Sequence, residues 1–189
     1  MSSLAEDLIH RHRYTVDDYY RMAESGILAP DARVELIEGE IVDMPPIGAP
    51  HAALVTMLQN RLIAAIGARA LARIQNPIRL DSRNEPEPDI ALVRNRSGHY
   101  RDRHPGPADV LLLVEVADSS LRYDRDVKMA LYARFGIPET WLVNLADATL
   151  TAFRAPGPQG YAMAERLRMD SPIPVPGLEG LSVDLTDLF

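Results

Sequence analysis

Apolar and polar positions in the first third of the chain predict a helix followed by a hairpin. Thr15 and Asp18 form a capping-box pattern at the start of a short helix, which Gly26 closes. Segment 33–44, "RVELIEGEIVDM", alternates on both sides of a Glu-Gly pair. This pattern predicts two antiparallel strands joined by a glycine turn.

A long amphipathic helix is predicted next. Leu54, Leu58 and Leu62 recur at i, i+4 and i+8, and Gly67 ends the pattern. Pro50 lies at the first turn, where a proline is well tolerated.

The rest of the chain reads as strands with one further helix. Strands are predicted at 72–80, 88–93, 110–117, 140–145 and 149–155, and a helix at 124–136. This order predicts a mixed α/β (α+β) fold in which helices flank a central sheet. We expect a single domain over residues 1–189, with residues 1–14 as a flexible N-terminal segment.

Composition excludes several classes of site. The chain has 189 residues, of which 47% are hydrophobic and 25% charged, as is usual for a globular domain. It has no cysteine, which excludes disulfides, thiolate zinc sites and cysteine nucleophiles. No apolar run has the length of a signal peptide or membrane span, so the expected location is the cytoplasm, without membrane partners.

Charge is unevenly distributed. The formal net charge is −7, which argues against a generally adhesive nucleic-acid binder. Segment 61–103, however, contains nine arginines and five acidic residues, a balance of +4, so the remainder carries −11. A basic middle could guide a polyanion to one place, although a solvated arginine-rich surface is the more common meaning of such a segment.

Lys128 is the only lysine among twenty basic residues. Lysine supplies a compact ammonium that titrates, whereas arginine supplies a rigid, permanently charged fork. Position 128 therefore indicates either a site that needs an ammonium or the chance survival of one surface lysine.

Glu115 interrupts the apolar run "VLLLVEVADSS" at 110–120, which has the pattern of a strand buried on both faces. A lone buried carboxylate would cost several kcal/mol, roughly. Glu115 must therefore be protonated, paired with a cation or bound to a metal. A salt bridge within the sheet is its only purely structural explanation.

Asp89 is the candidate for a second carboxylate beside Glu115. It follows Pro88 and opens the next apolar strand upstream, 26 residues before Glu115. Carboxylates on neighbouring strands can share one Mg²⁺, and a nearby lysine can orient water or stabilise charge on a phosphate. Two carboxylates could also act as the acid and base of a glycosidase, although aromatic residues make up only 6% of the chain.

The combined motifs resemble the PD-(D/E)XK nuclease superfamily, and more narrowly its Uma-type branch of small restriction endonuclease-like proteins. The resemblance runs through "RVELIEGEIVDMPPIGAPH", "EPDIALV", "LLLVEVADSS", "DRDVKMALYARFGIPETWLVN" and "PIPVPGLEGLSVDL", in the family's order. It implies a restriction-endonuclease-like fold, in which an N-terminal hairpin joins a central mixed sheet flanked by helices.

The resemblance also implies roles for individual residues. Asp89, Glu115 and Glu35 would be catalytic metal ligands for Mg²⁺, with Mn²⁺ as a substitute, and Lys128 the catalytic lysine. Four accessory residues occupy matching positions: His51, Gln75, Asp124 and Tyr132. The superfamily's usual lysine position, two residues after the glutamate, is Ala117 here, so Lys128 would be its migrated replacement.

The function expected from this resemblance is divalent-metal-dependent endonuclease cleavage of nucleic acid, with DNA as the expected substrate. Because cutting both strands of a duplex commonly needs two active sites, we expect a homodimer, built on the strands and Pro-rich tail after Trp141. The alternative is a catalytically silent protein of the same fold that acts as a binding or assembly module.

Overall fold

The structure is a computed structural model that describes residues 11–118 and 120–189. The fold divides into two compact units. The first comprises Met1–Met44 and Leu80–Pro86, and the second comprises Pro45–Arg79 and Glu87–Phe189. The expected single domain over 1–189 stays a prediction. Residues 1–10 of the expected flexible segment lie outside the described residues.

The first unit contains the predicted helix and hairpin, α1 (Val16–Glu24), β1 (Val34–Ile37) and β2 (Glu40–Asp43). The capping box is confirmed: the Asp18 amide donates to the Thr15 hydroxyl at 3.1 Å, and the Thr15 amide donates to Asp18 Oδ2 at 3.0 Å. Gly39 in the hairpin turn has a φ of 73°, and a Cβ there would lie 2.8 Å from that of Arg13. Glycine is therefore required at this turn.

The second unit is built on a six-stranded sheet with the order β3-β4-β5-β6-β7-β8, in which only the β5–β6 pair is parallel. Its elements, in chain order, are α2 (Ala49–Ile66), β3 (Ala70–Ile74), β4 (Ile90–Arg94), η2 (Pro107–Asp109), β5 (Val110–Ala117), α3 (Leu121–Tyr123), η3 (Asp124–Lys128), α4 (Met129–Arg134), β6 (Glu139–Asn144), β7 (Thr149–Gly157), β8 (Gly160–Arg166), β9 (Ile173–Pro174) and β10 (Ser182–Val183). The predicted mixed α/β class is confirmed. The edge strand β8 was not predicted.

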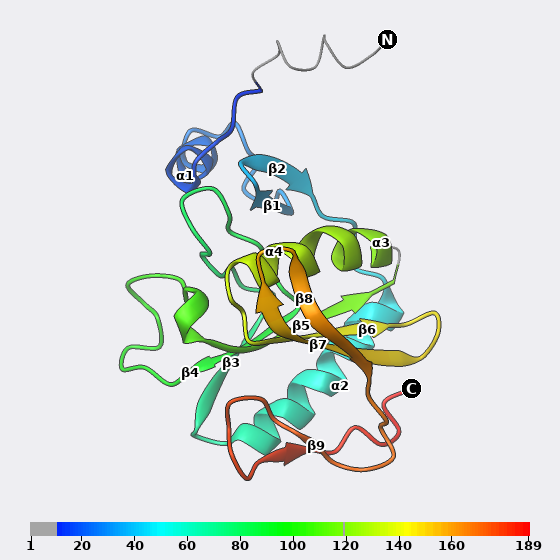
Figure 1. Cartoon of the computed structure of the whole chain (residues 1–189). Coiled ribbons are helices and arrows are strands. Elements are labelled where there is room, and N and C mark those ends of the chain that lie inside the picture. Colours follow the sequence, from blue (N-terminus) through cyan, green and yellow to red (C-terminus); the bar gives the residue numbers. More distant parts are fainter. Residues whose placement is uncertain (1–10, 119) are drawn as a thin grey trace. The chain divides into compact units, whose positions relative to one another are not determined.

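Helices cover both faces of this sheet, with α2 on one side and α3–α4 on the other (Figure 1). Alternation along β5 decides which side chain meets which layer. Leu112, Val114 and Val116 belong to the apolar cluster that includes the buried leucines of α2. Glu115 points to the opposite face, where it meets α4. Glu115 is thus buried between the sheet and α4, on the face opposite the apolar cluster.

The crossover from β5 to the parallel strand β6 contains a π-helical turn. η3 joins α3 to α4, and the Met129 amide donates to the Asp124 carbonyl five residues earlier. The predicted helix at 124–136 is thus present but starts at Leu121 and ends at Arg134. Single π-turns occur often at functional sites because they redirect side chains within a helix.

Candidate active site

The Asp89 carboxylate is held by three donors at the end of the loop that leads into β4. Its Oδ2 accepts a hydrogen bond from the main-chain amide of Val116 at 2.9 Å. His51 Nε2 lies 3.2 Å from the same oxygen, and Gln75 Nε2 donates to Oδ1 at 3.3 Å. Since Val116 follows Glu115 in β5, Asp89, which directly precedes β4, lies next to the strand that carries Glu115.

Gln75 has strained backbone geometry next to Asp89. Its φ is 49°, in the left-handed region that side chains other than glycine rarely adopt. The Gln75 amide donates to the Asp89 carbonyl at 3.0 Å, so both its backbone and its side chain contact Asp89. Such strain is concentrated at functional sites in proteins.

Glu115 is buried, with 3% of its surface exposed. Tyr132 donates its hydroxyl to Glu115 Oε1 at 2.6 Å, and Lys128 Nζ lies 3.4 Å from the same oxygen. Burial raises the pKa of Glu115 to about 8; the Asp124 and Asp89 charges add to this rise, while Lys128 and the Tyr132 hydrogen bond oppose it. The structure therefore places a cation beside Glu115, as one of the expected states requires, while burial favours the protonated carboxyl.

The π-turn η3 presents both Asp124 and Lys128 to the interior. Their exposed fractions are 4% and 5%, so Lys128 is not the surface lysine of the alternative interpretation. Asp124 Oδ2 accepts a hydrogen bond from the Ser120 hydroxyl at 2.5 Å. Lys128 thus lies within the cluster that contains Glu115.

Seven of the eight predicted site residues belong to the second unit, and the contacts above join them into one cluster: His51, Gln75, Asp89, Glu115, Asp124, Lys128 and Tyr132. Glu35 lies in β1 of the first unit, where it is buried with 3% exposure. The cluster therefore consists of second-unit residues, and the roles of all eight residues, Glu35 included, stay predictions.

Carboxylate oxygens such as those of Asp89 and Glu115 are ligands that a divalent ion such as Mg²⁺ accepts. No group of three or more His, Cys, Asp or Glu within residues 11–118 and 120–189 is arranged to hold a metal ion. Two carboxylates are nevertheless sufficient for Mg²⁺, which keeps several waters. Burial is the main cause of the raised pKa of Glu115, and the Asp89 charge adds to it, so the two carboxylates are close enough to interact. Asp89 and Glu115 therefore fit such an ion.

Two contacts in this cluster were not anticipated. The Val116 amide that holds Asp89 is a main-chain group, so no residue type indicates it. Ser120, which donates to Asp124, belongs to the "ADSS" segment after β5 and carries no distinctive pattern.

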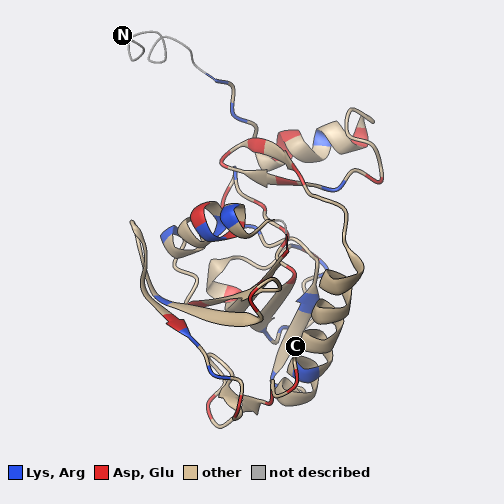
Figure 2. Cartoon of the chain, turned by 90° about the vertical axis from the view of Figure 1, so that its right-hand side faces the viewer, with Lys and Arg blue, Asp and Glu red and all other residues tan. Residues whose placement is uncertain are grey.

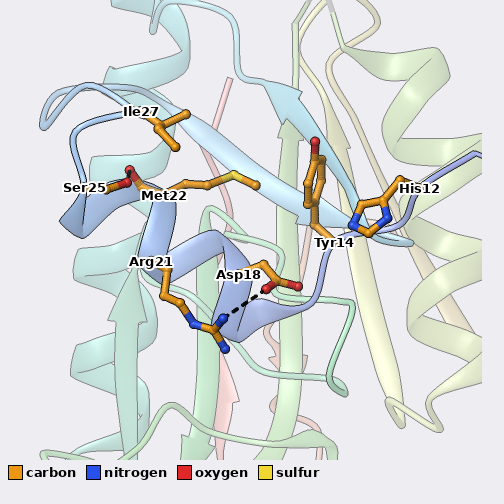
Figure 3. A pocket seen from close by; sticks show the side chains of 7 residues that line it. All are labelled: His12, Tyr14, Asp18, Arg21, Met22, Ser25 and Ile27. Atoms are coloured by element: carbon orange, nitrogen blue, oxygen red, sulfur yellow. Dashed lines mark hydrogen bonds and ion pairs between the residues drawn. The ribbon is translucent and has the colours of Figure 1, made fainter.

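The first unit contains a shallow pocket of its own. Figure 3 shows its lining around α1, with Asp18 paired to Arg21 at 3.6 Å. It has a volume of about 330 Å³ and contains none of the predicted site residues; its lining is His12, Tyr14, Asp18, Arg21, Met22, Ser25 and Ile27.

Residues 16–186 match the model of the Uma2 family, described as "putative restriction endonuclease". The chain belongs to this family. It is also similar to the crystal structure of a protein from Anabaena variabilis described as a putative nuclease belonging to DUF820. The TM-score is 0.70 at 18% sequence identity, over 93% of this chain and 97% of the other.

This similarity confirms the restriction-endonuclease-like fold expected from the sequence. Among curated proteins, none matches the chain. No helix in the described part of the chain is long and apolar enough to cross a membrane.

Proposed function

We propose that the second-unit cluster hydrolyses phosphodiester bonds of nucleic acid, with DNA as the substrate, in a reaction that depends on Mg²⁺ or Mn²⁺. The observation that carries this proposal is the convergence of two carboxylates and one ammonium on a single face of the sheet. Asp89 is fixed to β5 by the Val116 amide, and Lys128 lies against Glu115. Membership of the Uma2 family, whose description is "putative restriction endonuclease", supports the same chemistry.

Asp89 and Glu115 would hold the ion, which supplies Lewis-acid stabilisation of charge on the phosphoryl group when bound. His51, Gln75 and the Val116 amide keep the Asp89 carboxylate in one orientation. Lys128 would orient the attacking water or stabilise phosphate charge through its ammonium. Tyr132 fixes Glu115 through its 2.6 Å hydrogen bond.

The decisive experiment is a cleavage assay with plasmid DNA, single-stranded DNA and RNA, each in Mg²⁺, Mn²⁺ or EDTA. We expect metal-dependent cleavage of DNA that Asp89→Asn lowers by at least about 10²-fold, in the range of a lost catalytic group. Asp126→Asn is the matched control, because Asp126 is exposed and pairs with Arg125 at 2.7 Å.

Cleavage that persists in EDTA, or an Asp89→Asn variant as active as the Asp126→Asn control, would contradict the proposal. Cleavage of RNA alone would support phosphodiester hydrolysis but would contradict DNA as the substrate. Circular dichroism of each variant establishes that the fold is intact.

A non-catalytic binding module is the second candidate. Glu115 already has a cation at 3.4 Å and a hydroxyl donor at 2.6 Å, which together make a satisfied buried pair without any metal. If this candidate is correct, the protein binds nucleic acid in the same preparations and cleaves none of the three substrates in either metal.

We also propose a homodimer, built on the strands after Trp141. β8 in this region forms an edge of the sheet, and its Met163 is 55% exposed. Light scattering should then give about twice the chain mass of 21.0 kDa, and a mass of one chain at micromolar concentration contradicts the dimer.

A further inference from the structure

Arg73 is a partly buried arginine of the basic segment. Figure 2 shows Lys and Arg spread over several elements, and the structure accounts for many of them by pairing. Arg96 pairs with Asp102 at 2.8 Å and Arg103 with Asp109 at 2.7 Å. Within the described residues, Arg73 has no acidic partner.

The Arg73 guanidinium is only partly satisfied. One terminal nitrogen lies 3.4 Å from His104 Nδ1 and 3.5 Å from Asn76 Oδ1, both long for hydrogen bonds. Arg73 Nε is buried, and no acceptor within the described residues reaches it. Burial also lowers the pKa of Arg73, because desolvation disfavours its charged form, and Tyr100 opposes this with a smaller effect. A partly buried cation in this state is suited to an anion.

The strand register places Arg73 on the face of the sheet that carries Glu115. Arg73 pairs with Ala91 of β4, and Ala91 pairs with Leu113 of β5, two residues before Glu115. Directly paired residues in a sheet point to the same face, as do residues two apart in one strand. The neighbours Ala72 and Ile74 pack instead against the apolar cluster beneath α2.

We propose that Arg73, beside His104, is a positioning residue that binds a phosphodiester group of the nucleic-acid strand. This inference rests on the proposed function for the nature of the ligand. The guanidinium fork matches two oxygens of one phosphate, which a point charge does not. β3 lies two strand spacings from β5, about 10 Å, so Arg73 binds a phosphate neighbouring the one that reacts at Glu115.

Binding without cleavage tests this site. Fluorescence anisotropy would measure the affinity of a labelled DNA duplex in EDTA over a series of salt concentrations. We expect Arg73→Gln to weaken binding about three- to tenfold and to lower the slope of log K against log salt by about 0.9, the loss of one phosphate contact. Arg69→Gln is the control: it neighbours β3, but its side chain donates to the Glu179 carbonyl at 3.0 Å.

Arg73→Lys tests whether the site needs the shape of the guanidinium group or only its positive charge. We expect it to keep the salt slope and lose part of the affinity, and it serves as the second variant if Arg73→Gln fails to fold by circular dichroism. Inorganic phosphate is then added as a competitor of the DNA, and chloride at the same ionic strength is the control. If the ligand is a phosphodiester within a strand, phosphate should displace the DNA only weakly.

Equal affinity and slope for Arg73→Gln and Arg69→Gln would overturn the inference, as would absence of DNA binding by the natural chain. Displacement of DNA by micromolar inorganic phosphate would also overturn it, since the site would then be one for a small anion. If Arg73→Gln weakens binding while the natural chain cleaves nothing in Mg²⁺ or Mn²⁺, the phosphate site stands and the nuclease proposal fails.

Discussion

Two buried glutamates on neighbouring parallel strands have very different surroundings. Glu139, at the start of β6, accepts two hydrogen bonds from the Arg154 guanidinium, at 2.8 and 3.0 Å, and one from Trp141 Nε1 at 2.6 Å. Glu115 in β5 has the Lys128 ammonium at 3.4 Å and the Tyr132 hydroxyl. Their exposed fractions are 9% and 3%.

The difference lies in how completely each negative charge is compensated. A planar guanidinium that donates twice satisfies Glu139, as expected of a structural ion pair. Glu115 has a more distant ammonium and also faces the charges of Asp89 and Asp124, which raise its pKa. A buried carboxylate can therefore be either a structural ion-pair partner or a candidate site residue. The type of cation beside it and the neighbouring acidic residues distinguish the two roles.

Lys128→Arg should give the largest effect. The substitution keeps the charge and the helix propensity but replaces a compact ammonium that titrates with a bulky fork. Cleavage should fall by roughly 10²–10⁴, the contribution of a general acid–base group. A plasmid-nicking time course measures this loss. Full metal-dependent cleavage by the variant would refute the catalytic role of Lys128 and leave the metal site unaffected.

Glu115→Gln should change how stability depends on pH. In EDTA, the folded chain keeps a proton on Glu115 up to a pKa of about 8, whereas the unfolded chain releases it near 4.5. This contribution to stability is therefore complete below pH 4.5 and is lost as the pH rises through 8, by up to a few kcal/mol.

Urea unfolding at pH 5 to 9 would measure this dependence. Glutamine resembles the protonated acid, so the variant should lose less stability over that range than the natural chain. A variant whose stability falls just as steeply would assign the dependence to other groups.

Arg154→Lys is the reciprocal substitution at the other carboxylate. Lysine cannot reproduce the two parallel hydrogen bonds to Glu139, so the free energy of unfolding should fall by about 1–3 kcal/mol. Thermal unfolding measures the loss. Cleavage of DNA at a temperature where the variant stays folded should be unchanged. A catalytic defect at that temperature would show that Glu139 is not a purely structural ion-pair partner.

Tyr132→Phe should have the smallest effect. The Tyr132 hydrogen bond lowers the pKa of Glu115, so its removal should raise that pKa further. In the same urea series, the upper end of the pH-dependent loss should move to higher pH by roughly half a unit to one unit. A shift to lower pH would show that the hydroxyl does not favour the charged carboxylate.

Local patterns predicted the elements that carry the cluster, but not the contacts between them. Asp89 and Glu115 could be paired in advance because Asp89 directly precedes one apolar strand and Glu115 lies within the next. The approach of His104 to Arg73 depends on a loop that returns 31 residues later, which no local pattern encodes. The π-turn at 124–128 also has no signature, because the same residues suit an α-helix.

The missed strand β8 has a different cause. Five of its seven residues are exposed, so its sequence, "GYAMAER", lacks the alternation by which a half-buried strand is found. Glu35 was read as part of the same site from the resemblance alone, and its strand belongs to the other unit.

The burial of the single lysine also makes the chain an unusual target for amine-reactive reagents. Lys128 is the only lysine of the sequence and is 5% exposed, so its amine is shielded from an acylating reagent in water. Acylation at Lys128 requires the α3–α4 segment to open from the sheet. The rate of that single modification, followed by mass spectrometry, would therefore report the opening of the cluster without any engineered label.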